Sequence, residues 1–490
     1  MKAKFLPFIF TGLASFTFAQ YSTPNTGVEW TLDDIAAASP ETVTVSGNEY
    51  KLHENLIIET NDALLLNENL TLKIGSEVEI EVKGKFISDA GDEQITITAI
   101  DNETPYEGFW FYDESEGFFR NTLITHGGGI RVVTAKFEMY NCEMTHNIKS
   151  DGSSSGGAIS FSKGSPVIKN SIFKFNVHPA LSSGANTSVS ALIEGNYFEG
   201  NNTSNNNRPQ INMGPSGDAD SIRIINNTVI GDRDLTMVGG ISASSLVNVL
   251  NKIVIKGNIV KNNRYGITSM GNSTGVIADN VIEDNNSEGI PMNGGSGINL
   301  FSTNLIYVKN NQIRRNLWGV TMQGTAQANF GSDDDEDFNP GGNVFSENGN
   351  EGEVYALFNN TPNTVKALHN CWIEGQESTI EDVENVISHK NDDDTLGEVF
   401  FDPFECGVLM SINDLNKNSF KIYPNPARNS FFIESQEKGN VTVYDLSGKK
   451  VLSKNNLNGQ NQINISLPKG IYLVEFDNQK SKTTKKLVVE

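Results

Sequence analysis

The sequence predicts an all-β fold: a right-handed parallel β-helix (a solenoid) followed by a small antiparallel β-sandwich. A motif repeated between residues 255 and 320 is the first reason. Each copy runs aliphatic residue, asparagine, aliphatic residue, second asparagine, glycine and aliphatic residue. The second reason is the alternation of apolar and polar residues between residues 43 and 100, which is typical of half-buried strands. Residues 419–490 supply the third, because they carry a separate strand-and-turn pattern.

The N-terminal residues 1–19 have the composition of a secretory signal peptide. Lys2 and Lys4 precede an apolar run that ends in small residues before Gln20. Removing two lysines and no acids changes the formal charge from −23 to −25. No other apolar stretch is long enough to span a bilayer, so we expect no transmembrane segment in the mature chain. The strong negative charge argues against nucleic acid as a partner.

Residues 20–40 are expected to form a cap on the open end of the β-helix. Thr31 is a suitable N-cap for a short helix with acids in its first turn, and Leu32, Ile35 and Ala36 would share one face. Such a helix would cover the apolar surface and unpaired backbone that the last coil of a solenoid exposes.

The asparagine motif defines the long repeat. Its first asparagine recurs every 22 to 32 residues, aligned as Asn170, Asn196, Asn227, Asn258, Asn280, Asn311 and Asn343. A period of this length indicates a repeat architecture. Helical repeats would show apolar residues at a spacing of about 3.6, and a left-handed β-helix would show a hexapeptide rhythm; both are absent. Three short strands per coil fit best.

In that geometry the asparagines are structural. Equivalent turns stack at the strand spacing, so the side-chain amides can form a hydrogen-bonded ladder along the axis. Asparagine also tolerates the left-handed backbone of tight turns. The paired copies are Asn258 with Asn263, Asn280 with Asn285, and Asn311 with Asn316.

This pattern resembles the parallel β-helix repeat of pectin-lyase-like proteins and of the carbohydrate-binding and sugar-hydrolysis group. The resemblance covers residues 41–407 and implies a carbohydrate-related activity. The segment from His369 to Pro403 is similar to the closing coil of bacterial proteins of this kind. The motifs that carry catalysis in polygalacturonases and pectate lyases are missing, so the resemblance identifies no catalytic residue and leaves the enzyme class open.

Residues 408–418 read as a polar linker. In residues 419–490, Tyr423-Pro-Asn-Pro426, Tyr444-Asp-Leu-Ser-Gly-Lys449 and Lys469-Gly-Ile-Tyr-Leu-Val474 closely resemble the C-terminal sorting domain of the type IX secretion pathway. The resemblance implies the type IX machinery as a partner. It also implies export across the outer membrane of a Gram-negative bacterium, through the periplasm, to the cell surface or the medium. Alternation at Val441/Val443, Ile463/Ile465 and Ile471/Leu473 predicts the inward faces of its strands.

The three cysteines do not form a disulfide framework. Cys142 and Cys371 align with first-asparagine positions of distant coils, too far apart to bond. Cys371 either pairs with Cys406 or, like Cys142, is a small buried residue.

Candidate functional residues lie between the two asparagine columns. One column reads Thr145, Glu199, Lys261, Glu283, Arg314, Ser346, and the next reads His146, Gly200, Asn262, Asp284, Arg315, Glu347. The alternating signs favour a ladder of surface salt bridges. The alternative is a lyase-like site in which Lys261, Arg314 and Arg315 approach a uronate and carboxylates such as Asp284 hold calcium.

Histidines and acidic runs provide further candidates. His126 and His146 align on adjacent coils and could bind a metal or transfer a proton, although no third ligand is evident. The runs that contain Asp333, Asp335 and Asp337, and Asp392 and Asp394, could bind calcium, but neither has the spacing of a calcium-binding loop, which favours solvated loops. Trp110, Trp318 and Trp372 could stack on sugar rings or pack internally.

The sequence therefore predicts an exported or cell-surface β-helix protein that engages polysaccharide by binding or by depolymerising it. The rival hypothesis is a non-enzymatic structural surface protein or adhesin in which the β-helix is a rigid spacer.

Overall fold

The computed structural model describes residues 20–148, 157–290, 294–350, 352–406, 420–445, 449–478 and 482–489. The signal peptide expected at residues 1–19 and the whole linker expected at 408–418 lie outside these ranges. The chain divides into two compact units, one ending at Cys406 and the other beginning at Gly407. Their cores are separate clusters of buried side chains.

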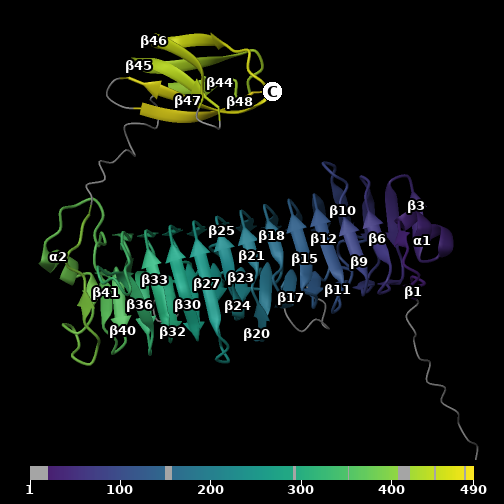
Figure 1. The fold of residues 1–490 in the computed structure, drawn as a ribbon, viewed down its shortest axis with the longest axis horizontal. Coiled ribbons are helices and arrows are strands. Elements are labelled where there is room, and N and C mark those ends of the chain that lie inside the picture. The colour runs from purple at the N-terminus through teal and green to yellow at the C-terminus, as the bar shows by residue number, and fades with distance from the viewer. Residues whose placement is uncertain are drawn as a thin grey trace, which may run out of the picture. The chain divides into compact units, whose positions relative to one another are not determined.

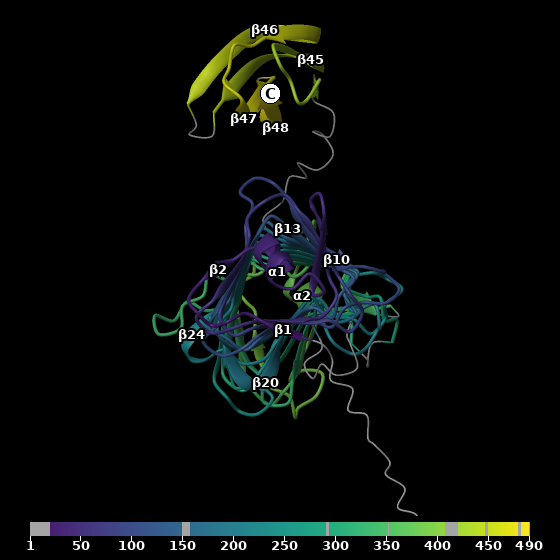
Figure 2. The same ribbon diagram turned by 90° about the vertical axis from the view of Figure 1, so that its right-hand side faces the viewer.

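The first unit is a parallel β-helix. Within its described residues, three long sheets run along the axis, and each coil except those at the two ends contributes one strand to each sheet (Figure 1). A view along the axis shows the sheets as three sides, with helix α1 (Leu32–Ala38) across the near end (Figure 2). We call the sheets A, B and C, and the chain visits them in that order in each coil.

Sheet A consists of β1 (Gln20–Ser22), β5 (Asn55–Ile58), β8 (Glu79–Val82), β11 (Gly108–Phe111), β14 (Ile130–Val132), β17 (Ile159–Gly164), β20 (Leu181–Val189), β23 (Ile211–Met213), β26 (Ile241–Ala243), β29 (Ile267–Gly271), β32 (Ser296–Ser302), β35 (Trp318–Gln323), β40 (Leu357–Asn360) and β42 (Ile387–Ser388).

Sheet B consists of β2 (Glu29–Trp30), β6 (Ala63–Leu66), β9 (Lys85–Ser88), β12 (Glu116–Arg120), β15 (Lys136–Tyr140), β18 (Val167–Lys169), β21 (Leu192–Glu194), β24 (Gly217–Ile225), β27 (Asn251–Lys256), β30 (Ser273–Ala278), β33 (Leu305–Lys309), β36 (Gln327–Gly331), β41 (Val365–Ala367) and β43 (Val399–Phe400).

Sheet C consists of β3 (Val43–Ser46), β4 (Glu49–Leu52), β7 (Thr71–Ile74), β10 (Ile95–Ala99), β13 (Thr122–Thr125), β16 (Glu143–Thr145), β19 (Ile172–Lys174), β22 (Tyr197–Glu199), β25 (Thr228–Ile230), β28 (Ile259–Lys261), β31 (Val281–Glu283), β34 (Gln312–Arg314) and β37 (Val344–Ser346). β3 and β4 pair antiparallel, whereas the other neighbours in the three sheets are parallel. A short antiparallel hairpin, β38 (Gly349–Asn350) with β39 (Glu353–Val354), follows sheet C.

The alternation in residues 43–100 is confirmed, because its aliphatic residues from Leu64 to Ile97 that alternate with polar ones are buried, whereas Val45 and Ile100 near its ends are exposed. Helix α1 is also confirmed. Thr31 and Asp34 form a capping box, in which each side chain bonds the other residue's backbone, and Leu32 and Ile35 are buried. At the other end of the β-helix, α2 (Ile380–Glu384) begins with a second capping box, built by Thr379 and Asp382. Among the described residues, no helix combines the length and apolar character needed to span a membrane.

The cysteines behave in two ways. Cys371 and Cys406 form a disulfide, with Cα atoms 4.2 Å apart. Cys142 is free and buried, and its burial raises the pKa of the thiol to about 12. The disulfide ties the last described residue of the β-helix to the coil that contains Trp372.

The second unit is one antiparallel sheet of β44 (Phe420–Tyr423), β45 (Ser430–Tyr444), β46 (Lys450–Asn464), β47 (Gly470–Asp477) and β48 (Lys482–Val489). Val441, Val443 and Ile463 are buried as predicted. The prediction for Ile471 and Leu473 was wrong, because both are about 40% exposed, at 39% and 40%. The neighbouring Tyr472, Val474 and Phe476 face the core instead, since the side-chain period of a strand makes a shift of one residue reverse the faces.

Candidate functional site

Two corners fix each short strand of sheet C in the middle of the β-helix. At β31, Asp279 and Asp284 have positive φ values of 57°, and each is followed by a fully buried asparagine, Asn280 or Asn285. Most neighbouring coils repeat this pair of corners. A residue in the left-handed region turns the chain sharply. The asparagine that follows it forms hydrogen bonds with buried backbone groups.

The first asparagine column is a continuous ladder. Each side-chain amide donates to the Oδ1 atom of the next coil at 2.8–3.0 Å, through Asn196, Asn227, Asn258, Asn280, Asn311, Asn343 and Asn370. Each Oδ1 also accepts the backbone N–H of the preceding asparagine. The predicted ladder is therefore confirmed.

Two assignments in this column were wrong by one residue. Ser171, not Asn170, occupies the ladder, because the Ser171 backbone N–H donates to Asn196 while Asn170 takes the left-handed corner. Likewise Asn370, not Cys371, holds the last position. In both cases two polar or small residues stand together at the corner, and either can be aligned from the sequence.

The second column contains a residue that the sequence did not reveal. Amides continue the ladder at 2.7–3.1 Å through Asn147, Asn176, Asn201, Gln210, Asn263, Asn285, Asn316 and Asn348. Gln210 replaces the asparagine of the coil that contains β25. Its longer side chain reaches from the start of β23 to accept from Asn201 and donate to Asn263.

The charged residues between the columns form an ion-pair cluster on the outer face of sheet C. Glu283 lies 2.7 Å from Lys261, 3.2 Å from Arg314 and 3.1 Å from Arg315. Arg315 also contacts Asp284 at 2.8 Å. The register of the strands places Lys261, Glu283 and Arg314 side by side, as the sequence alignment predicted.

Arg314 has a second acidic partner. Its Nε and Nη2 atoms donate to the two oxygens of Glu374 at 2.6 and 2.7 Å, which is a bidentate contact. Its side chain is only 14% exposed. Burial raises the pKa of Glu283, but the hydrogen bond from Lys261 and the nearby arginines outweigh it and hold the pKa below its usual value. Lys261, Arg314 and Arg315 are therefore all paired with carboxylates of the protein itself.

The two predicted histidines lie side by side. The rings of His126 and His146 stack with centroids 5.5 Å apart, and Phe175 continues the stack on the next coil. Burial, followed by the charge of His146, lowers the pKa of His126. Across the part of the chain that the structure describes, no three His, Cys, Asp or Glu side chains are grouped so as to hold a metal ion.

The acidic run at residues 333–337 is engaged mainly by cations. Lys366 lies 2.5 Å from Asp334 and 2.8 Å from Asp337, and His369 lies 2.9 Å from Asp333. Asp335 is exposed.

The second acidic run, at residues 392–394, contributes to a turn. Asp392 accepts the backbone N–H of His389 at 2.9 Å, while Asp394 is exposed. His389 itself is buried and bonds Glu384 of α2 and the backbone of Val399, a structural role that the sequence did not indicate.

The tryptophans differ in their surroundings. Trp372 is buried and stacks on Phe345 at 4.9 Å, which is internal packing. Trp110 stacks on Tyr112 at 4.6 Å and has the guanidinium of Arg131 4.2 Å from its ring centre. Trp318 is half-buried on the outer face of sheet A and borders a hollow.

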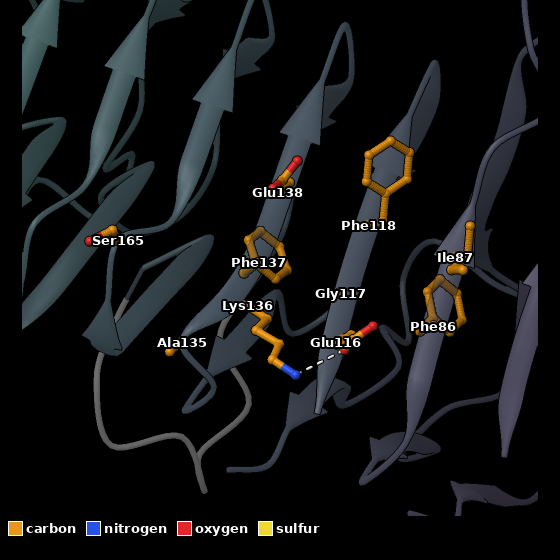
Figure 3. Close-up of a pocket in the computed structure, with 10 residues that line it drawn as sticks. All are labelled: Phe86, Ile87, Glu116, Gly117, Phe118, Ala135, Lys136, Phe137, Glu138 and Ser165. Atoms are coloured by element: carbon orange, nitrogen blue, oxygen red, sulfur yellow. Dashed lines mark hydrogen bonds and ion pairs between the residues drawn. The ribbon is translucent and has the colours of Figure 1, made fainter. Parts of the chain in front are cut away.

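Sheet B carries two hollows on its outer face. One has a volume of 530 Å³ and lies over β9, β12 and β15 (Figure 3). Phe118 stands over it, and Lys136 reaches Glu116, which also pairs with Lys85, each at 2.9 Å. Glu116 is thus neutralised by two lysines, while Glu138, which also lines the hollow, accepts a hydrogen bond from Tyr140 at 2.9 Å. The other hollow, of 740 Å³, lies over β27, β30 and β33 beside Tyr307.

The candidate site is a groove on the outer face of sheet A. Two hollows of 660 and 390 Å³ adjoin there and share Asn207, Tyr265, Thr268 and Met270. We call them together the sheet A groove. It crosses the six successive coils from β20 to β35 and therefore runs along the axis of the β-helix.

The floor of the groove is a row of small polar side chains, one from each coil. In order along the axis they are Ser182, Asn212, Ser242, Thr268, Asn299 and Thr321, and the strand registers pair each with the next. These residues alternate with inward aliphatic side chains on the same strands, so the hydroxyls and amides face outward. The sequence motif did not predict this row, because a lone serine or threonine in a short strand is not distinctive.

Aromatic and basic residues form one wall. Tyr265 and Trp318 occupy equivalent positions, each two residues before an inward aliphatic residue of sheet A, Ile267 and Val320. Burial raises the pKa of Tyr265 to about 12. Gly239 makes room for this ring, because a Cβ atom there would lie 2.1 Å from it.

The charge of the groove differs from that of the chain. Arg208 and Arg264 line it, and none of its described lining residues is an aspartate or a glutamate. The whole chain has 60 acidic and 37 basic residues. A cleft of this kind admits neutral or acidic sugars without placing carboxylates of the protein against them.

Comparison with known proteins concerns only the second unit. Residues 421–490 match the family model of the secretion system C-terminal sorting domain. The protein thus ends in a type IX sorting domain, which makes it a secreted cell-surface protein that interacts with the type IX secretion machinery. No curated protein matches the chain.

Proposed function

We propose that the protein binds an extended polysaccharide at the bacterial surface, in the sheet A groove. The observation that carries the proposal is the groove itself: an elongated cleft with a floor of hydroxyls and amides, two aromatic side chains on its wall and no acidic lining residue. Sugars present hydroxyls at their edges and C–H groups on their faces, so they match hydrogen-bonding floors and aromatic walls.

The proposed binding site is the sheet A groove and not the charged residues of sheet C that the sequence suggested. Lys261, Arg314, Arg315 and Asp284 already satisfy one another or Glu283 and Glu374, so a uronate would have to displace existing ion pairs. His126, His146 and the acidic runs likewise stay outside the proposed site. We assign no catalytic residue and no calcium, and we propose binding rather than cleavage.

Retention on glycans tests the proposal. The full mature chain is run through gels that contain neutral or uronate-bearing polysaccharides, and retardation is compared with that of Trp318→Ala. The matched control is Tyr307→Ala, which removes an outward aromatic residue from sheet B. We expect retardation by at least one glycan, reduced by the first variant and unchanged by the control.

Retardation by none of the glycans would refute the proposal and favour the structural surface protein or adhesin. The continuous amide ladders supply the rigidity that this second function needs. If the protein is incubated with the same polysaccharides, unsaturated products or new reducing ends would show that it cleaves the polysaccharide that it binds.

A further inference from the structure

The floor of the sheet A groove has a regular repeat. Neighbouring coils of parallel strands are about 4.8 Å apart, so the row from Ser182 to Thr321 places one hydroxyl or amide at each such step. The two end residues are only 2% exposed and share hydrogen bonds with the hydroxyls of Ser160 and Ser296, so a ligand reaches the middle of the row most easily. A ligand that bonds every floor residue must itself repeat at nearly this distance along the axis.

The wall carries Tyr265 and Trp318 two coils apart, and Tyr355 holds the same position on the coil that follows Trp318. Ser296 lies at the same position on the coil between Tyr265 and Trp318, since it pairs directly with Trp318 and its carbonyl accepts from Gly266. The two aromatic residues are therefore two coils apart, about 9.6 Å. Their rings lean away from each other: Tyr265 lies against Gly239 of the preceding coil, and Trp318 stacks on Phe358 of the following coil at 4.7 Å.

The space between these rings is the smaller hollow of the groove. Its floor there is Asn299, and Gly294 borders it with a φ of +128°. Arg264 is held beside it by a 2.7 Å bond to Asn207. The compartment is thus two coils long and bounded at both ends by aromatic rings.

We infer that the groove takes a β-1,4-linked polysaccharide in its extended two-fold form, lying parallel to the axis with one sugar per coil. In such a chain successive sugars advance by nearly the distance between coils, so each can reach one floor residue. Alternate sugars face opposite ways, and the same edge returns every second sugar, which matches the two-coil separation of Tyr265 and Trp318. This inference rests on the proposed polysaccharide binding and adds the linkage and direction of the chain.

Other linkages do not fit both the one-coil spacing of the floor and the two-coil separation of Tyr265 and Trp318. A β-1,3-linked chain curves into a helix and leaves the floor after a few sugars. An α-1,4-linked chain also coils, so it brings different edges to successive coils. The inference concerns linkage geometry and not the identity of the sugar, because a row of hydroxyls and amides hydrogen-bonds to many sugar hydroxyls.

Calorimetry with defined oligosaccharides tests the inference. The full mature chain is titrated with β-1,4-linked gluco-, manno- and xylo-oligosaccharides of two to six sugars, and with β-1,3- and α-1,4-linked oligosaccharides of equal length. We expect at least one β-1,4 series to bind with affinity that rises with each added sugar up to six. The other linkages should bind at least about tenfold more weakly.

Variants locate the binding on the floor. Thr268→Val keeps the shape of the side chain and removes the hydroxyl, so it should weaken binding of the longest oligosaccharide about three- to tenfold. Thr228→Val, on the outer face of sheet C, is the matched control and should leave affinity unchanged.

The outcomes separate this inference from the proposed function. Equal affinity for all linkages, affinity that does not rise with length, or an unchanged Thr268→Val variant would overturn the one-sugar-per-coil arrangement while glycan binding stands. Absence of binding by every oligosaccharide and every polysaccharide would overturn both.

Discussion

Replacement of Asn280 by alanine tests whether the amide ladder holds the coils together. The side chain is fully buried in the middle of the first ladder. Its Oδ1 accepts from the backbone and the side chain of Asn258, both at 2.9 Å. Its Nδ2 donates to Asn311 at 2.9 Å and to the carbonyl of Ile255 at 3.0 Å. The variant Asn280→Ala therefore removes four hydrogen bonds at once.

The expected loss of unfolding free energy follows from that count. A typical internal hydrogen bond contributes about 1 kcal/mol net, and a buried group left without its partner costs more. The buried N–H of Asn258 loses its acceptor, while Asn311 keeps the bond from the backbone of residue 280. We expect a loss of about 3 to 5 kcal/mol. Ile259→Ala is the control, because this neighbouring side chain points outward and is 39% exposed; it should cost about 1 kcal/mol or less.

Urea unfolding of the mature chain measures both changes. The transition of the β-helix is followed by intrinsic tryptophan fluorescence, since Trp110, Trp318 and Trp372 all lie in that unit. Hydrogen exchange followed by mass spectrometry localises the effect, and faster exchange is expected in the coils next to residue 280, because each repeat contacts only its neighbours. A loss no larger than that of Ile259→Ala would refute the view that the ladder stabilises the stack.

Three further predictions concern charge and covalent structure. Arg314→Met leaves the buried Glu283 and the half-buried Glu374 without a shared cation and should cost about 1 to 3 kcal/mol by urea unfolding; an unchanged midpoint would show that the ion pairs are dispensable. The pKa of Glu79 is raised to about 6, first by burial and then by neighbouring glutamates, so the folded protein binds this proton more tightly than the unfolded chain and loses stability as pH rises from about 4.5 to 6. Glu79→Gln should therefore raise the Tm at pH 7.5 and change it little at pH 4, and equal effects at both would contradict the assignment. Cys371→Ser opens a 35-residue loop and should lower stability by about 3 to 4 kcal/mol in the chain-entropy model, measured against the oxidised parent; equal stability would contradict it.

The sequence predicted the features that are determined within a single repeat or a single short segment. Helix α1 followed from Thr31 and Asp34, which lie three positions apart, and the amide ladder followed from asparagines in equivalent turns. The alignment of Lys261, Glu283 and Arg314 was also correct, because the asparagines on either side of each three-residue strand fix its length. In these places the information sits within one repeat.

Features that depend on two distant segments were not predicted. Gln210 lies outside the sheet C turns, but its side chain is long enough to join the second amide ladder. Nothing near it in the sequence indicates that role. Glu374, the bidentate partner of Arg314, is 60 residues away in the sequence. Aligning the residues between the two asparagine columns therefore revealed only part of the ion-pair cluster. The floor of the sheet A groove went unrecognised because Ser242 and Thr268, one coil apart, become a row only once the loops between them are placed.

The placement of the amide ladders favours sheet A over sheet C as the face for the proposed ligand site. Both amide ladders flank sheet C, and from β16 to β37 every strand of that sheet has three residues, so its outer face is short and uniform. Strands of sheet A vary from two to nine residues. The longer connections also precede sheet A, as between β22 and β23 and between β25 and β26, where Arg208 enters the groove wall and Gly239 supports Tyr265. Apart from the ladder residues Asn201 and Gln210, the sequence of these connections can change without breaking an amide ladder. A change in the length of a sheet C strand, in contrast, would shift a buried asparagine out of register. Recognition residues can therefore diversify on sheet A while the scaffold is kept, and Thr268→Val is expected to alter binding at little cost to stability.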